Sequence, residues 1–152
     1  ISNDAIDLSL LITDNYALDT ISEPMERFAQ AELLALQHRY PQAEAALDSL
    51  LADWPGHALE DDILFRKATW ARLNGRFDEA LVFLEEITAL HFDDVLADDA
   101  LFWRAVILEN HLDRASDALP LYEQLLFDYP GSLHVIAARE RFRALSTEEE
   151  AG

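Results

Sequence analysis

The chain repeats itself at a fixed interval, and this repeat constrains its fold more than any other feature. The stretch LEDDILFRKA at residues 59–68 returns as LADDALFWRA at residues 96–105. Phe65 and Phe102 are therefore 37 positions apart, and a further step back of 37 reaches Phe28. Because an interval of this size is typical of stacked structural units, the sequence predicts three copies of one unit.

Each copy carries two alanines at matching positions. The first set is Ala31, Ala68 and Ala105, and the second set is Ala43, Ala80 and Ala118. The second alanine follows the first by twelve residues in two copies and by thirteen in the third, as if the third turn held one inserted residue. We expect turns between the two alanines at residues 39–42, 74–77 and 111–115. The pattern predicts a helical hairpin that is repeated three times.

The spacing of apolar residues inside each copy favours helices. Between residues 63 and 73, Leu64, Phe65, Ala68 and Ala71 recur at steps of three or four, whereas a strand would alternate. The acid pairs at residues 61–62 and 98–99 are expected where first helices begin, since a carboxylate favours the positive end of a helix.

Proline and glycine mark the expected ends of two second helices. Trp54-Pro55-Gly56 and Tyr129-Pro130-Gly131 stand at corresponding places in the first and third copies. The residue before proline is pushed out of the α region, and glycine accepts a left-handed turn. The second helices should therefore end just before these two triplets.

These landmarks resemble the tetratricopeptide repeat family, whose hairpins carry a small residue in the first helix, an alanine early in the second, and a proline at the end. The two alanine sets match the first two landmarks, and Pro55 and Pro130 match the third. The resemblance covers about residues 22–130. The Tyr-Pro-Gly-Ser step at residues 129–132 is similar to the end of the repeats in bacterial envelope assembly and cell-division proteins.

The resemblance implies an all-α fold, a right-handed superhelical solenoid of stacked antiparallel helix hairpins with about seven to eight helices. We expect a single solenoid domain over residues 1–152, and we expect the stretch from Asn3 to about Tyr16 to form a helix. Its expected parts are an N-terminal helix at 1–20, which is half of a truncated upstream repeat, three repeats at 22–57, 58–94 and 95–131, a capping helix at 132–146, and a tail at 147–152.

The sequence departs from the family pattern in several respects. The interval is 37 to 38 residues rather than the usual 34. Polar residues precede the first alanine of each copy, at Gln30, Lys67 and Arg104, where the family usually has leucine. Pro120 falls inside the last expected second helix, which should therefore begin late or kink there.

The charge of the chain excludes one class of partner. Thirty Asp and Glu against eleven Lys and Arg give a formal net charge of −19, so a nucleic-acid partner is excluded for lack of a basic face. Two interpretations of the acidity stay open. Spread over the whole length, it is typical of a surface adapted to high salt, which is the favoured interpretation, and the alternative is that it recruits a basic partner.

The sequence contains no recognisable catalytic, cofactor or metal motif. Four glycines leave no room for a phosphate-binding loop or a nucleophile elbow, and the five histidines form no pair at a spacing of four. The acids at 93–99 lack the ligand order and central glycine of a calcium loop. No apolar run is long enough for membrane insertion. We therefore predict a protein without catalysis, cofactor or metal. Because the chain begins with Ile1, we also expect it to be a segment of a longer protein.

Binding of a protein or peptide segment remains as the predicted function. In the tetratricopeptide repeat family the first helices line a concave surface that receives segments of other proteins, and the resemblance assigns eleven residues to that surface. They are Met25, Phe28, Glu32, Asp62, Phe65, Thr69, Arg72, Asp99, Phe102, Val106 and Glu109.

Apolar anchors in an acidic setting favour a hydrophobic and basic partner segment. The alternative is that Phe28, Phe65 and Phe102 are packing residues of an architectural spacer that has no ligand of its own. The resemblance favours the bacterial periplasm or envelope over the cytoplasm.

Overall fold

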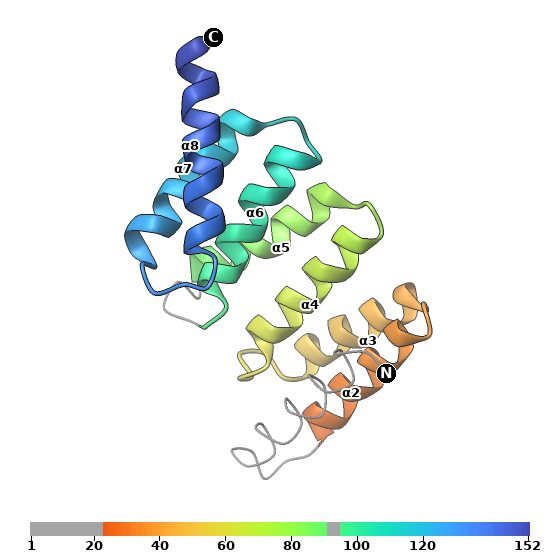
Figure 1. Cartoon of the computed structure of the whole chain (residues 1–152). Helices are drawn as coiled ribbons and strands as arrows, with labels where there is room; N and C mark the ends of the chain where they lie inside the picture. The colour runs from red at the N-terminus through yellow and green to blue at the C-terminus, as the bar shows by residue number, and fades with distance from the viewer. Residues whose placement is uncertain (1–22, 91–94) are drawn as a thin grey trace. The chain divides into compact units, whose positions relative to one another are not determined.

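The computed structural model describes residues 23–90 and 95–152, and all regular structure within these ranges is helical (Figure 1). The described helices are α2 (Glu23–Leu36), α3 (Tyr40–Asp53), α4 (Glu60–Leu73), α5 (Phe77–Leu90), α6 (Ala97–Asn110), α7 (Ala115–Asp128) and α8 (Val135–Ala151). The helix predicted for Asn3 to Tyr16 lies outside the described residues. The chain divides into two compact units, residues 1–63 and residues 64–152, and each is described by itself.

The helices reproduce the interval seen in the sequence. The first helices α2, α4 and α6 begin at Glu23, Glu60 and Ala97, which are 37 residues apart, and each of α2 to α7 contains 14 residues. The turns inside the hairpins span residues 37–39, 74–76 and 111–114. The inserted residue predicted for the third turn is therefore confirmed.

The first hairpin turn lies earlier than the predicted range of 39–42. Helix α3 begins at Tyr40 and contains Pro41 within its first turn. Proline is well tolerated there because the first backbone N–H groups of a helix have no partner inside the helix. Pro41 therefore opens α3 rather than belonging to the turn.

One left-handed residue closes each hairpin turn. His38, Gly75 and Asp113 have φ angles of 59°, 76° and 53°. In each case the following arginine donates its backbone N–H to a carbonyl in the last turn of the preceding helix, at 2.8–2.9 Å, as in a Schellman-type helix end. The acceptors of Arg39, Arg76 and Arg114 are Leu34, Ala71 and Leu108. The extra residue of the third turn thus leaves the closing bond in place.

Consecutive helices pack against each other within each unit. In the first unit α2 packs on α3, and in the second unit α5 packs on α6, α6 on α7 and α7 on α8. The Lys67 ammonium group of α4 lies over the Phe83 ring of α5, 4.5 Å from its centroid. The fold is therefore a stack of helices paired in chain order, as Figure 1 shows for α4 to α8.

The alanines of both sets lie in the cores. Ala31 and Ala43 in the first unit are fully buried, and so are Ala80, Ala105 and Ala118 in the second, while Ala68 is 2% exposed. A methyl group is the largest side chain that lets two helix backbones approach closely without overpacking. The prediction that these alanines mark the contacts between helices is confirmed.

The helix ends follow the sequence landmarks with one difference. Helices α3 and α7 end at Asp53 and Asp128, directly before the two proline triplets, as predicted. The acids Asp98 and Asp99 lie inside the first turn of α6, whose cap residue Leu96 makes no side-chain cap hydrogen bond. These carboxylates therefore act on the helix dipole rather than as a side-chain cap.

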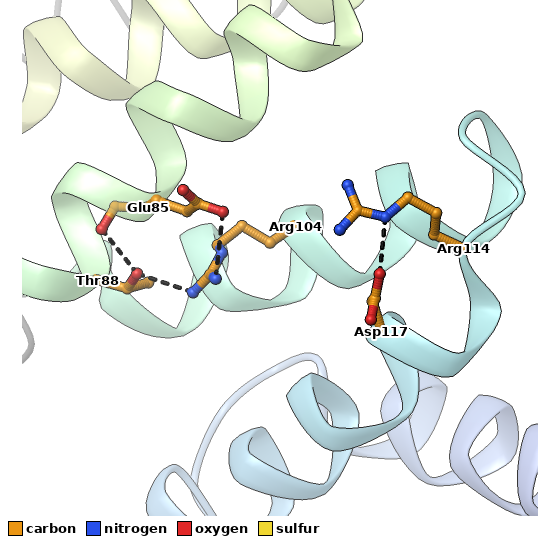
Figure 2. A network of polar contacts seen from close by, with 5 residues as sticks. All are labelled: Glu85, Thr88, Arg104, Arg114 and Asp117. Carbon is orange, nitrogen blue, oxygen red and sulfur yellow. Dashed lines mark hydrogen bonds and ion pairs between the residues drawn. The ribbon is translucent and has the colours of Figure 1, made fainter.

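Two basic residues at the family's leucine position join neighbouring helices. Lys67 contacts Phe83 as described, and Arg104 of α6 reaches back to α5 (Figure 2). Arg104 Nη1 donates to Thr88 Oγ1 at 3.0 Å, and its Nη2 lies 3.6 Å from the Glu85 carboxylate. Burial lowers the pKa of Arg104, and the nearby Glu85 charge opposes this shift. These contacts offset part of the cost of burying the cation, although Arg104 Nε is buried without a hydrogen-bond partner among the described residues.

A second ion pair, shown in Figure 2, lies at the start of α7, the second helix of the third hairpin. Arg114 Nε donates to Asp117 Oδ2 at 2.7 Å, and both side chains are more than half exposed. Helix α7 begins at Ala115 and continues through Pro120, so it does not begin late. Pro120 is exposed, and the carbonyl that loses a partner there belongs to the exposed Ser116, where water can replace the bond.

Helix α8 is longer than predicted. It continues to Ala151, so residues 147–151 are helical instead of forming a tail. Ser146 Oγ and Thr147 Oγ1 donate to the carbonyls of Phe142 and Arg143, at 2.7 and 2.9 Å. The glutamates that follow are good helix formers.

Across the described residues, none of the helices combines the length and the apolar character that crossing a membrane requires.

Enlarging a buried alanine should destabilise the stack. Ala105→Leu adds three carbon atoms at a position that is fully buried. The overpacking should lower the free energy of unfolding by about 1–3 kcal/mol, as measured by chemical denaturation. The matched control is Ala137→Leu, at an exposed position of α8, which should change stability by less than about 0.5 kcal/mol. Equal effects of the two substitutions would remove Ala105 from the helix contact.

The left-handed turn residue gives a second prediction. Gly75→Ala should lower the free energy of unfolding by about 1 kcal/mol, because alanine is strained at a positive φ although nothing lies within 4 Å of the added carbon. Gly131→Ala is the control, since this glycine also has open space and its φ is not left-handed. Thermal unfolding of both variants measures the difference, and a stable Gly75→Ala protein would contradict the assigned turn.

Candidate functional site

Three residues predicted for the binding surface surround one depression in the second unit. Phe65, Thr69 and Arg72 share one face of α4, because they are spaced at four and three residues. Together with Ala68 of α4, Leu84 of α5 and Trp103 of α6 they line about 190 Å³ of empty space, part of it open to solvent. Its enclosed part measures only about 10 Å³, roughly what one water molecule needs and far less than a small-molecule site. A ligand group would therefore rest at the mouth of the depression rather than inside it.

Arg72 provides the charge of this depression. Its guanidinium carbon lies 4.2 Å from the centroid of the Trp103 ring, a cation–π contact between α4 and α6. Partial burial lowers the pKa of Arg72 below its usual value. Within residues 23–90 and 95–152, no hydrogen bond or ion pair joins Arg72 to another residue. The hydroxyl of Thr69, by contrast, donates to the Phe65 carbonyl at 2.9 Å.

Two predicted residues at the beginning of α6 contact the start of α8. His134 Nε2 lies 2.6 Å from Asp99 Oδ1, and the His134 ring stacks on Phe102 with centroids 4.2 Å apart and an angle of 9°. Phe102 also makes edge contacts with Trp103 and with Tyr122 of α7. Asp99 and Phe102 are therefore engaged in packing the last helices together.

Glu109 joins three helices through one carboxylate. Its side chain is 7% exposed, and its Oε2 accepts the Tyr122 hydroxyl of α7 at 2.7 Å. Its Oε1 accepts from both Nε and Nη2 of Arg141 of α8. Burial, then the hydrogen bond to Glu109, raises the pKa of the Tyr122 phenol, and the hydrogen bond to Glu109 raises the pKa of Arg141. Because Tyr122 is fully buried, its hydroxyl needs this partner.

The remaining predicted residues are placed differently. In the first unit, Met25, Phe28 and Glu32 of α2 are buried, with exposures of 3%, 1% and 4%. Asp62 is half-buried in the first turn of α4, and Val106 is half-buried on α6. The structure thus brings Phe65, Thr69 and Arg72 together, and it places Asp99, Phe102 and Glu109 in contacts with α7 and α8. The assignment of the eleven residues to a partner-binding face stays a prediction.

Several residues that shape these sites could not be found from the repeat. Trp103 follows Phe102, but the corresponding positions of the other copies hold Arg66 and Ala29, so the interval of 37 gives no signal there. His134 and Arg141 lie beyond the last copy. The only signal in the sequence that could have indicated Trp103 is its position directly after Phe102, as a second aromatic residue in the third copy.

Among the residues that the structure describes, no group of three or more histidine or carboxylate side chains is arranged to hold a metal ion. The Glu109 carboxylate binds the Tyr122 hydroxyl and the Arg141 guanidinium.

Comparison with known proteins identifies one repeat. Residues 99–132 match the sequence model of a tetratricopeptide repeat, from the first turn of α6 through α7 to Ser132. A comparison with curated proteins gives no match. Repeats of this type are in general protein–protein interaction modules and are typically not catalytic, and the matched segment coincides with the third hairpin of the stack.

Proposed function

We propose that the chain is a non-catalytic interaction module that binds a segment of another protein on the first-helix surface of α4 and α6. The observation that carries this proposal is the depression between these helices, where Arg72 has no polar partner among the described residues. A side-chain cation held against an aromatic ring at the edge of a small hollow is suited to receive a polar group of a partner. The tetratricopeptide repeat at 99–132 supports a protein as that partner.

The contacts of Phe102 favour a second candidate, an architectural segment with no ligand of its own. Phe102 packs between His134 and Tyr122, and Phe65 packs partly buried against the same core cluster. Such contacts with neighbouring helices favour a role for both phenylalanines in stabilising the helix stack. The two candidates differ in whether a segment of another protein occupies the surface of α4 and α6.

The compartment forms part of the proposal as well. The similarity of the step at residues 129–132 to envelope and cell-division proteins favours the bacterial periplasm or envelope. The net charge of −19 supports either a salt-adapted surface or a basic partner, as the sequence left open.

Filling the depression should abolish binding without unfolding the chain. We expect Thr69→Arg to remove the proteins captured by the immobilised chain, because a long side chain would occupy the hollow beside Arg72. Val82→Arg on α5 is the matched control, since Val82 is 58% exposed and does not line the depression. Capture is compared by mass spectrometry at the working salt of the source cells, and circular dichroism verifies the fold of each variant.

The outcome of this capture separates the candidates. Retained capture by Thr69→Arg would contradict binding at the depression, and the absence of any captured protein would favour the architectural segment. Captured proteins from the periplasm would support the proposed compartment, and cytoplasmic ones would contradict it.

The architectural candidate makes its own prediction. Phe102→Ala should lower the free energy of unfolding by about 2–4 kcal/mol, because it removes the ring between His134 and Tyr122. Phe127→Ala on α7 is the control, since Phe127 is 85% exposed. Its removal should change the free energy of unfolding by less than about 0.5 kcal/mol. Urea denaturation measures both, and a loss for Phe102→Ala as small as that of the control would speak against a packing role.

A further inference from the structure

Arg72 differs from the other partly buried or paired arginines of the chain. Five arginines bind a carboxylate at 2.6–3.6 Å or closer, and they are Arg27, Arg76, Arg104, Arg114 and Arg141. Arg72 contacts only the Trp103 ring among the interactions of the described residues. A partly buried arginine that has no carboxylate partner among residues 23–90 and 95–152 differs from these five, since burial of a cation without a partner carries a free-energy cost.

The stacking on Trp103 holds the guanidinium group at the depression. A guanidinium carries five N–H donors in one plane, so a cation–π contact made through its carbon leaves donors available to other groups. Thr69 donates its hydroxyl proton to the Phe65 carbonyl and so does not offer it to a ligand. Arg72 therefore supplies the hydrogen-bond donors at the depression, and these donors are charged. Phe65, Ala68 and Leu84 supply its apolar wall. A ligand group that fits both features has an anionic end and an aliphatic neighbour.

The negative charge of the chain does not prevent such a ligand from binding here. Asp62, in the acidic first turn of α4, precedes Arg72 by ten residues, which corresponds to about 15 Å along the helix axis. This separation exceeds the Debye length of about 8 Å at physiological salt. The Asp62 charge is therefore largely screened at Arg72, whereas a carboxylate in contact with Arg72 is not.

We infer that the depression on α4 binds an aspartate or glutamate side chain of the partner segment, next to an aliphatic residue that packs on Phe65. This rests on the proposed function and specifies its partner. It replaces the basic segment that the overall charge favoured with an acidic and aliphatic one at this position. The local environment of one cation decides the preference at the contact, while net charge acts mainly on long-range encounter.

Selection from a random peptide library displayed on phage tests the inference with the full 152-residue chain as bait. We expect the enriched peptides to share an Asp or Glu beside Leu, Ile or Val. A synthetic copy of an enriched peptide should bind about tenfold more tightly than the same peptide with that acid replaced by its amide, as judged by calorimetry.

Two variants then locate the contact. Arg72→Gln should weaken the acidic peptide about tenfold and leave the amide peptide unchanged. Arg76→Gln is the control, since this arginine is one turn away and paired with Glu79, and it should bind both peptides as the unmodified chain does. Equal weakening by the two variants, or none by Arg72→Gln, overturns the inference.

The failures of the inference and of the proposed function remain distinguishable. Enrichment of basic or purely apolar peptides would overturn the acidic ligand and leave the interaction module standing. Enrichment of nothing would count against both. If Arg72→Gln unfolds the chain, Trp103→Leu provides a second variant, which should also weaken the acidic peptide because it removes the ring that holds the guanidinium.

Discussion

The close approach of helix backbones at buried alanines is the constraint on which the structure depends. A hairpin of two 14-residue helices has an apolar side that it cannot cover alone, so the next helix must lie on it. Ala105 and Ala118 are fully buried at this contact in the matched repeat. Once the backbones are close, only side chains at the edges of the contact are free to differ. The distinctive residues Arg72, Trp103, Arg104 and Glu109 are all partly buried rather than fully buried.

The recurrence of one hairpin could be predicted from the sequence because burial repeats with the chain. The positions of the first alanines follow from the interval of 37, and the spacing of the alanine pairs predicts the second and third turns and the extra residue of the third turn. The structure places all of these accordingly. The first turn was displaced because Pro41 can open a helix as well as end one. The prediction of a tail at 147–152 was wrong because α8 continues through these residues. Ser146 and Thr147 donate their hydroxyl protons to carbonyls of the same helix.

The candidate site was only partly accessible to the same reasoning. Phe65, Thr69 and Arg72 were assigned to one face by helical spacing, and they line one depression. Trp103 was missed because it occurs in a single copy, and the partners of Asp99 and Glu109 were missed because α8 lies outside the repeat. A period describes what the copies have in common. Specific contacts arise where a copy differs from the others or where the series ends.

The third turn shows how the stack accommodates a change in length. Asp113 takes the left-handed position, Arg114 closes the turn as Arg39 and Arg76 do, and the following helix again has 14 residues. An added residue is therefore looped out before it can rotate the apolar side of the next helix. In a chain of this design, insertions and deletions can accumulate at the hairpin tips while the faces that touch stay in phase, so tip length and stacking can evolve separately.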